Sequence, residues 1–275
     1  MKKIILLLSL FFLLLPAMAF SEIRLGLLPR LPEQEMVEMF TPLAKYLEKE
    51  IGQKVTIVVP KDFDAFTKMA IAGEFDLGYA NPYIYVLIKK DVPAAEPLAL
   101  AAEPKIGTRF KGILFVRKDK PVKSVHDLKG KKIAFQDPGS AGAYLVQMLM
   151  LKEAGISKAE ITPVFVKKRD AVADAVLFGK ADAGGIREDD LEKVPNSAEF
   201  RVIGTSAWIT NFPLFATKKA DEAVTAKVRD ALLKLKPGTA KAFPVSGPAK
   251  IEGFVPITDK DFDLIREAAR AAGAL

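Results

Sequence analysis

An internal repeat constrains the fold of this chain more than any other feature of its sequence. Residues 56–82 align without a gap onto residues 162–188, and identities recur along the alignment. Each copy has the pattern of a strand rich in β-branched residues, a polar turn, a helix with apolar residues three and four apart, a glycine stop and a second short strand. Two such units in one chain predict two similar lobes. The matched pairs include Asp64 with Asp170, Gly73 with Gly179, Asp76 with Asp182, and Gly78 with Gly184.

The sequence around each copy continues the alternation of strands and helices. Residues 23–28 and 132–135 have the pattern of strands, and residues 43–51 and 141–154 have the pattern of helices. Gly155 marks the end of the second of these helices. Alternation of this kind predicts an α/β fold, in which parallel-type sheets carry helices on both faces.

The chain has to pass between the two lobes, and we expect the connecting segments near residues 101–112 and 206–215. We expect helices at residues 221–235 and 259–271 to return to the first lobe, because the second lobe is complete before them. The expected lobes are a discontinuous first lobe, residues 20–108 with 212–275, and a second lobe, residues 109–211.

The first nineteen residues have the pattern of a secretory signal peptide. Lys2 and Lys3 precede an apolar run at residues 4–15, and small residues follow at Ala17 and Ala19. The run is shorter than the roughly 20 residues that a membrane-spanning helix needs. Because the chain contains no cysteine, the mature N-terminus has no site for a lipid anchor. We therefore expect a protein exported to the periplasm through a cleavable signal peptide at residues 1–19.

The composition excludes several classes of function. The chain has no cysteine and a single histidine, His126, which removes thiolate nucleophiles, cysteine-ligated zinc and most histidine-based sites. No nucleophile with a base and no metal cluster is evident, so we expect no enzymatic activity, no cofactor and no metal. The net charge is +7, but the lysines are scattered, which argues against nucleic-acid binding. A basic surface instead attracts small anions.

The position of a ligand site follows from the fold class. Open α/β sheets bind ligands beyond the carboxyl ends of their strands, and the ends of two facing sheets line a shared cleft. The loops expected at those ends are residues 28–30, 62–63, 79–85, 136–142 and 185–188. We therefore expect the functional residues within these loops.

The loop at residues 136–144, QDPGSAGAY, carries the strongest motif. Ser140 is placed to cap a helix, and the small residues Ala141 and Gly142 leave the first backbone N–H groups accessible to an anion. The same motif also occurs where it only caps a helix, so the pattern alone leaves both roles open. Arg169 at the start of the repeat helix indicates either an anionic partner or a salt bridge. Arg187 matches Asn81 in the repeat and is either a ligand residue or a surface arginine.

Three blocks of the sequence resemble a known family. They are FDAFTKMAIAGEFDLGYANPYIYV at residues 63–86, SVHDLKGKKIAFQDPGSAGAYL at residues 124–145, and VKKRDAVADAVLFGKADAG at residues 166–184. They resemble the substrate-binding proteins of phosphate, phosphite and phosphonate ABC transporters. The resemblance implies a two-lobed, type II periplasmic binding fold that closes on its ligand and docks on a membrane permease.

The resemblance also implies a set of pocket residues, several of which differ here. The family loop reads D-P-x-S-T-S-G, and this chain keeps Ser140 but has Ala141 and Gly142 in place of the next two hydroxyl residues. A family tyrosine is replaced by Phe63, and a family histidine by Arg169. Tyr85 keeps the family's aromatic position.

These observations give one working hypothesis and one alternative. A monomer binds a small oxyanion such as phosphate, phosphite or a phosphonate, and delivers it to an ABC permease. In the site, Ser140 and the N–H groups of Ala141 and Gly142 hold the anion, Arg169 supplies charge with Arg187 nearby, and Phe63 and Tyr85 form the walls. The alternative is a ligand-sensing protein that presents its closed form to a membrane receptor or histidine kinase.

Overall fold

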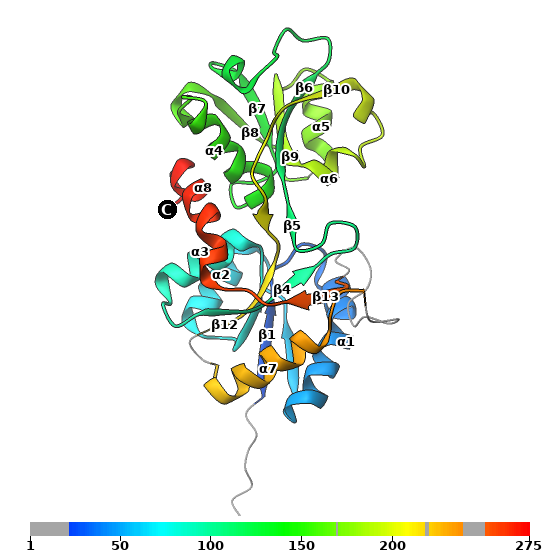
Figure 1. Cartoon of the computed structure of the whole chain (residues 1–275), viewed down its shortest axis with the longest axis vertical. Helices are drawn as coiled ribbons and strands as arrows, with labels where there is room; N and C mark the ends of the chain where they lie inside the picture. Colours follow the sequence, from blue (N-terminus) through cyan, green and yellow to red (C-terminus); the bar gives the residue numbers. More distant parts are fainter. Residues whose placement is uncertain (1–21, 169, 218–219, 239–250) are drawn as a thin grey trace, which may run out of the picture.

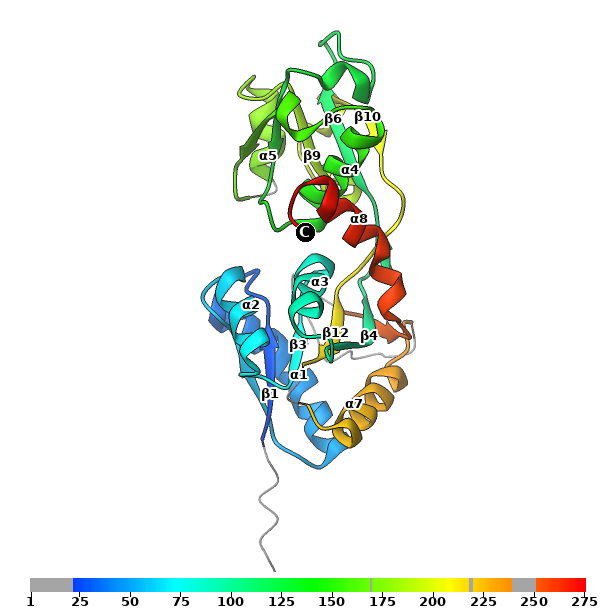
Figure 2. The same ribbon diagram turned by 90° about the vertical axis from the view of Figure 1, so that its left-hand side faces the viewer.

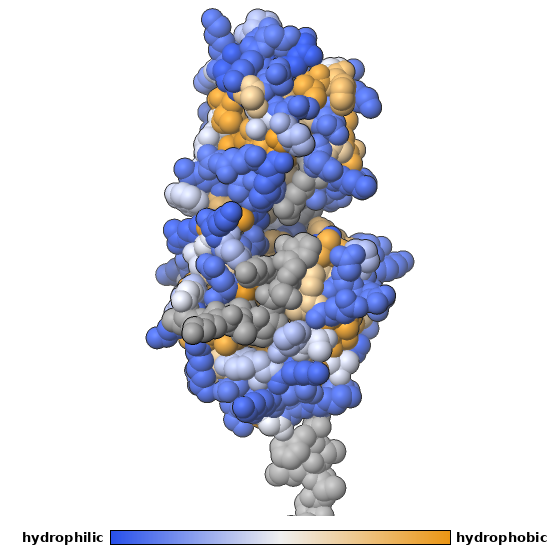
Figure 3. Space-filling view, turned by 90° about the vertical axis from the view of Figure 1, so that its right-hand side faces the viewer, coloured by the Kyte–Doolittle hydropathy of each residue, from blue (hydrophilic) through white to orange (hydrophobic). Residues whose placement is uncertain are grey.

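A computed structural model describes residues 22–168, 170–217, 220–238 and 251–275. The predicted signal peptide and Arg169 lie outside the described residues. Two α/β lobes are stacked along the long axis of the molecule (Figure 1). The polypeptide crosses from one lobe to the other through the segments that contain the paired strands of a two-stranded sheet. On the face in Figure 3 hydrophilic side chains cover much of both lobes, and the surface narrows between them. Within the described part of the chain, no helix combines the length and apolar character needed to cross a membrane.

The first lobe contains a six-stranded sheet in the order β13-β4-β12-β3-β1-β2. The strand β1 pairs in parallel with β2 and β3, whereas β12 is antiparallel to both β3 and β4. The strands are β1 (Ile23–Leu27), β2 (Val55–Val58), β3 (Leu77–Tyr79), β4 (Glu96–Ala102), β12 (Pro213–Ala216) and β13 (Gly253–Val255). The helices are α1 (Glu33–Ile51), α2 (Phe63–Ala72), α3 (Pro82–Asp91) and α7 (Glu222–Lys234). As expected, α7 packs on this lobe, against α1, β4 and β13.

The second lobe contains a five-stranded sheet in the order β10-β6-β9-β7-β8. Here β7 pairs in parallel with β8 and β9, and β6 is antiparallel to β9 and β10. The strands are β6 (Gly112–Arg117), β7 (Lys132–Phe135), β8 (Thr162–Phe165), β9 (Ala183–Arg187) and β10 (Phe200–Thr205). The helices are α4 (Val146–Glu153), α5 (Asp170–Leu177) and α6 (Glu188–Leu191). Short helical turns of this lobe lie at Val125–Leu128, Ala141–Leu145, Lys158–Glu160 and Ser197–Glu199, and a further one, Asp259–Phe262, precedes the last helix of the chain.

The sequence repeat has a matching repeat of hydrogen bonds. The units β2-α2-β3 and β8-α5-β9 occupy equivalent places in the two sheets. In the first lobe the Oδ2 atom of Asp76 accepts a hydrogen bond from the backbone N–H of Arg24 at 2.8 Å. In the second lobe the Oδ2 atom of Asp182 accepts one from the N–H of Lys132 at 2.9 Å. These equivalent carboxylates fix β1 and β7 beside the second strand of each unit.

Equivalent glycines also make the same packing possible in both sheets. Gly78 lies opposite Phe215 of the neighbouring antiparallel strand, and Gly184 lies opposite Phe115. A Cβ atom at either glycine would overlap the facing phenylalanine ring. Each sheet therefore needs a glycine at this point to seat a fully buried aromatic ring.

The two lobes are connected by a short antiparallel ribbon. The strand β5 (Arg109–Phe110) pairs with β11 (Ile209–Thr210), and the register places Ile209 opposite Phe110. Both strands fall within the connecting segments predicted from the sequence. Because this ribbon joins the lobes, rotation of one lobe against the other has to be absorbed next to it.

The last helix differs from the prediction. We expected residues 259–271 to return to the first lobe, but α8 (Asp263–Ala271) contacts both α3 of the first lobe and α4 of the second (Figure 2). Beyond its end, the Nζ atom of Lys158 donates to the carbonyl of Ala272 at 3.1 Å, and the hydroxyl of Tyr83 donates to the carbonyl of Ala274 at 3.4 Å. The amphipathic pattern predicts an apolar helix face, but it does not specify which lobe that face covers.

Candidate functional site

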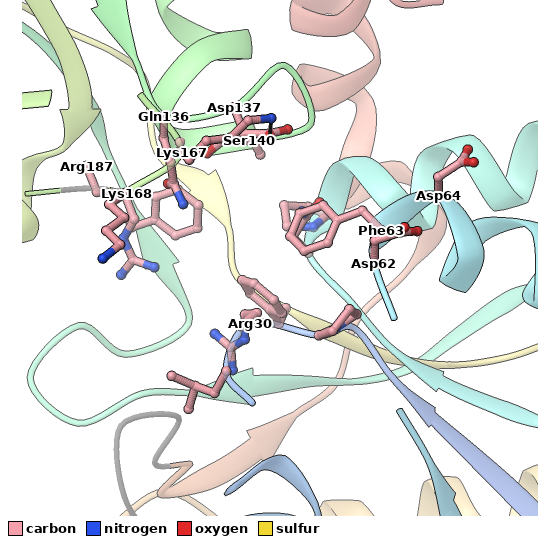
Figure 4. A pocket seen from close by; sticks show the side chains of 18 of the residues that line it. Arg30, Asp62, Phe63, Asp64, Gln136, Asp137, Ser140, Lys167, Lys168 and Arg187 are labelled. Atoms are coloured by element: carbon pink, nitrogen blue, oxygen red, sulfur yellow. Dashed lines mark hydrogen bonds and ion pairs between the residues drawn. The ribbon is translucent and has the colours of Figure 1, made fainter. Parts of the chain in front are cut away.

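A cleft of about 750 Å³ lies between the lobes at the carboxyl ends of their parallel strands. Loops that follow β1, β2 and β3 of the first lobe face loops that follow β7, β8 and β9 of the second (Figure 4). All the loops predicted to form a site contribute to the lining. The cleft is lined by residues 29–31, 61–64, 81–82, 110, 136–137, 140–142, 167–168, 170, 187 and 212.

The loop after β7 presents the beginning of a helix to this cleft. Its turn is held by Asp137, whose carbonyl accepts the N–H of Ser140 at 3.0 Å and whose Oδ1 atom accepts the N–H of Gly139 at 2.8 Å. The Oγ atom of Ser140 then caps the helix by accepting the N–H of Ala143 at 3.1 Å. The first turn carries no acidic residue. The N–H groups at the start of a helix have no acceptor within it, so this end can donate to an anion.

The helix starts with a wide turn rather than the continuous α-helix expected over residues 141–154. Over Ala141–Leu145 the backbone forms a π-helical turn, in which the N–H of Val146 donates to the carbonyl of Ala141. The buried side chain of Gln147 donates from Nε2 to the carbonyl of Gly142 at 2.8 Å and to that of Ile186 at 3.1 Å. Gln147 therefore satisfies carbonyls that the wide turn leaves available, and it fixes the turn to β9.

The side chains of Phe110 and Arg187 pack closely against Gly142. A Cβ atom there would lie 2.6 Å from the Cε2 atom of Phe110 and 2.8 Å from the Cγ atom of Arg187. The serine that the family resemblance implies at this position would therefore have no room in this arrangement. Within residues 140–142, the backbone N–H groups and the hydroxyl of Ser140 are thus the donors that face the cleft.

Arg187 lines the cleft, but its charge is largely compensated. Its Nε atom donates to Oδ1 of Asp189 at 2.9 Å, and its Nη2 atom lies 3.5 Å from Oε2 of Glu103. The guanidinium also covers the ring of Phe110 at 4.2 Å from the ring centroid. Burial lowers the pKa of Arg187, but the charges of Glu103 and Asp189 outweigh burial and raise it. Arg187 therefore stays charged and buttresses Phe110 and Gly142 at the lobe junction.

Arg30 is a cleft residue that the sequence analysis did not single out, although the loop at residues 28–30 was identified. Its guanidinium carbon lies 4.3 Å from the ring centroid of Phe212 and 5.8 Å from that of Tyr79. Its Nε and Nη2 atoms are buried, and no hydrogen-bond partner reaches them among the described residues. The signal in the sequence that could have identified Arg30 was a positively charged residue shortly after the first strand.

The lobes touch at one side of the cleft. Asn81 caps α3 by accepting the N–H of Ile84 at 2.9 Å, and its Nδ2 atom donates to the carbonyl of Gly139 in the other lobe at 3.2 Å. Phe63, at the start of α2, approaches the same glycine. Phe63 thus forms a wall of the cleft where the two lobes meet.

Tyr85 does not line the cleft, so the expectation that it walls the pocket is wrong. Its side chain is fully buried, its hydroxyl donates to Oδ1 of Asp259 at 2.7 Å, and its ring packs 4.6 Å from that of Phe262. Burial and the bond to Asp259 raise the pKa of the phenol, which keeps it a donor. Tyr85 follows Asn81 by one helical turn, which places it about 6 Å deeper along α3.

Three lysines add positive charge at the rim. Lys61, Lys167 and Lys168 line the cleft and are exposed. Only Lys167 among them lies near a carboxylate, with its Nζ atom 3.4 Å from Oδ2 of Asp137 in the described structure. Arg169 follows these lysines in the sequence but lies outside the described residues, so its role stays a prediction. Among the residues described, no group of His, Asp or Glu is arranged to hold a metal ion.

Comparison with known sequences matches most of the chain to one family. The family model for the periplasmic phosphonate substrate-binding protein of ABC transporters matches residues 25–262. The phosphate-import protein PhnD of Mycolicibacterium smegmatis is 26% identical over 276 residues, which cover 92% of this chain and 86% of that protein. The phosphonates-binding periplasmic protein of Escherichia coli is 25% identical over 236 residues, covering 81% and 69%.

Solved structures share the fold at low sequence identity. XAC2383 from Xanthomonas citri, bound to a chloride ion, superposes with a TM-score of 0.78 at 21% identity, covering 92% of this chain and 97% of that one. PhnD1 from Prochlorococcus marinus, in complex with methylphosphonate, gives a TM-score of 0.72 at 17% identity, covering 92% and 99%.

Proposed function

Because the chain belongs to the periplasmic substrate-binding proteins of phosphonate ABC transporters, we propose that its interlobe cleft binds a small oxyanion such as phosphate, phosphite or a phosphonate. The predicted family and the predicted two-lobed type II periplasmic binding fold are confirmed. Proteins of this family bind solutes for membrane permeases, so the chain is a binding protein and not an enzyme. The family is periplasmic.

The observation that carries the proposal is the free helix end in the cleft. The hydroxyl of Ser140 and the N–H groups of Ala141 and Gly142 donate to the oxygens of the anion, which also gains from the positive end of the helix dipole. Phe63 forms the apolar wall beside them, and Arg169 adds positive charge. Arg187 supports the site from behind through Gly142 and Phe110.

The finer properties of the protein are part of the same proposal. Residues 1–19 are removed as a signal peptide, and the mature protein carries no lipid anchor, because the chain has no cysteine to receive one. The mature protein acts as a monomer, and its two lobes close on the ligand about the β5 and β11 ribbon. The closed form is the one that docks on the permease.

A thermal-shift screen tests the proposed ligand class. The purified protein is unfolded and refolded to remove co-purified ligand, and then heated with phosphate, phosphite, methylphosphonate, sulfonates or small carboxylates. A ligand at 100 times its dissociation constant stabilises the folded state by about 2.7 kcal/mol. For a chain of this size we expect the melting temperature to rise by roughly 5–10 °C with a phosphorus oxyanion.

Two serine variants test whether the ligand-induced rise in melting temperature comes from binding in the cleft. Ser140→Ala removes the proposed ligand donor together with a helix cap, and Ser157→Ala removes a cap outside the cleft. Loss of a serine cap costs about 1 kcal/mol in either case. The ligand-induced shift should fall in Ser140→Ala and persist in Ser157→Ala. A shift with sulfonates or carboxylates alone would contradict the proposed ligand class.

A further inference from the structure

The guanidinium of Arg30 lacks a counter-charge in the described structure. Its Nε and Nη2 atoms are buried without a hydrogen-bond partner, and no carboxylate of the described residues forms an ion pair with it. Arg187, in the same cleft, contacts two carboxylates. A buried donor without an acceptor is costly, and the cost is higher when the donor is charged. The buried Nε and Nη2 atoms of Arg30 are therefore available to an acceptor that the described residues do not supply.

The hydroxyl of Tyr79 is a second donor beside Arg30. Tyr79 is 1% exposed, and its hydroxyl lies next to the guanidinium of Arg30, with no acceptor for the hydroxyl proton among the described residues. Burial raises the pKa of this phenol more than the charge and the hydrogen bonding of Arg30 lower it, so the hydroxyl keeps its proton. The buried nitrogens of Arg30 and the hydroxyl proton of Tyr79 are together suited to an anionic oxygen.

Arg30 lies across the cleft from the start of the helix. It follows β1 of the first lobe, whereas Ser140 follows β7, the equivalent strand of the second lobe (Figure 4). The ring of Phe212 lies against the guanidinium at 4.3 Å and leaves the edge of that planar group for hydrogen bonds. Arg30 and Ser140 thus form two separate polar ends of one cleft of about 750 Å³.

We propose that Arg30 binds a second anionic group of the ligand, so that the cleft takes a phosphonate or phosphate ester that carries a carboxylate or a second phosphoryl group. This inference rests on the proposed function, because it takes the helix end at Ser140 as the place of the first phosphoryl group. A ligand with an ammonium group at its far end is repelled by Arg30, and a ligand with an alkyl end leaves Arg30 unpaired. The cleft therefore discriminates by the charge of the far end.

Calorimetric titration with three phosphonates of similar length tests this inference. They are ethylphosphonate with a neutral end, 2-aminoethylphosphonate with a cationic end, and 3-phosphonopropionate with an anionic end. The refolded protein should bind 3-phosphonopropionate at least about tenfold more tightly than ethylphosphonate, and 2-aminoethylphosphonate more weakly than either. This factor corresponds to one hydrogen-bonded charge pair.

Variants of Arg30 identify the residue responsible. Arg30→Met should reduce the affinity for 3-phosphonopropionate to that for ethylphosphonate, and leave ethylphosphonate within about twofold of the original protein. Arg30→Lys keeps the charge without the planar fork and should retain part of the preference. As a control, Lys61→Met removes an exposed cation of the same lobe and should weaken all anions by the same small factor.

The outcomes separate this inference from the proposed function. Equal affinities for the three ligands, or an Arg30→Met variant that weakens ethylphosphonate as much as 3-phosphonopropionate, would overturn the role of Arg30 but keep the phosphonate site. If the protein binds none of the three, then the proposed function fails and the inference fails with it.

Discussion

Replacing Arg187 with methionine is expected to lower the free energy of unfolding by about 3–5 kcal/mol at neutral pH. The side chain of Arg187 is 6% exposed, and it neutralises Glu103 and Asp189, which are also largely shielded from water. Methionine fills similar space but leaves these carboxylates without their buried partner. Of the cations in the described residues, only the exposed Lys193, 2.9 Å from Oδ2 of Asp189, remains beside them. Denaturant unfolding measures the difference.

The loss caused by Arg187→Met should depend on pH. Burial raises the pKa of Asp189, but the charge of Arg187 and the bond from Lys193 outweigh it, so the pKa is lowered in the folded protein. The stabilisation linked to that shift is present above the unfolded pKa of about 3.9 and is lost as the pH falls through the folded value. The deficit of the variant should therefore be largest at about pH 5 and above, and should shrink as the pH falls below the unfolded pKa of about 3.9.

A matched surface pair provides the control for Arg187. Lys68 contacts Asp64 at 2.7 Å with both side chains about three-quarters exposed, and Lys68→Met should cost no more than about 0.5 kcal/mol. In the pair Arg187→Met and Glu103→Gln, the double variant should be more stable than the sum of the single losses predicts. A loss below about 1 kcal/mol in Arg187→Met would contradict the supporting role of the residue.

Replacing Gly142 with alanine is expected to weaken ligand binding at least about tenfold and to lower the free energy of unfolding by about 1–3 kcal/mol. The added Cβ atom would overlap Phe110 and Arg187, both buried and held against each other. The first helical turn then has to move, and its N–H groups move with it. Calorimetric titration with the best ligand of the thermal screen measures the affinity.

The same loop offers a control for Gly142. A Cβ atom at Gly139 would meet Oδ1 of Asp137 at 3.4 Å and Cδ2 of Phe63 at 3.5 Å, which are ordinary contacts. Gly139→Ala should therefore change stability by no more than about 0.5 kcal/mol. Adding Phe110→Leu to Gly142→Ala should recover part of the affinity by making room. If Gly142→Ala binds as well as the original protein, the packing account of this loop is wrong.

The strands and the position of the cleft could be predicted because their signals are local. The repeated βαβ pattern places Asp76 and Asp182 at equivalent turns, and the structure gives them equivalent hydrogen bonds. Loops after parallel strands meet at one edge of a sheet whatever their sequence, so the cleft follows from topology. Ser140 was identified for the same reason, since a helix cap is visible in a few consecutive residues.

Partners distant in the sequence could not be predicted. Tyr85 has the aromatic character of a pocket wall, but Asp259, to which its hydroxyl donates, lies near the other end of the chain. The contacts of α8 with both lobes depend on surfaces that a helical pattern does not distinguish. The proposed role of Arg30 depends on the absence of an ion-pair partner among the described residues, and a missing partner leaves no pattern in the sequence.

A crystal structure of the refolded protein with the phosphorus oxyanion that gives the largest thermal shift tests the central claim most directly. The account predicts the anion between the lobes, with its oxygens within hydrogen-bond distance of the Ser140 hydroxyl and the N–H groups of Ala141 and Gly142. An anion bound outside the interlobe cleft, or bound in it without contact to residues 140–142, would contradict the claim.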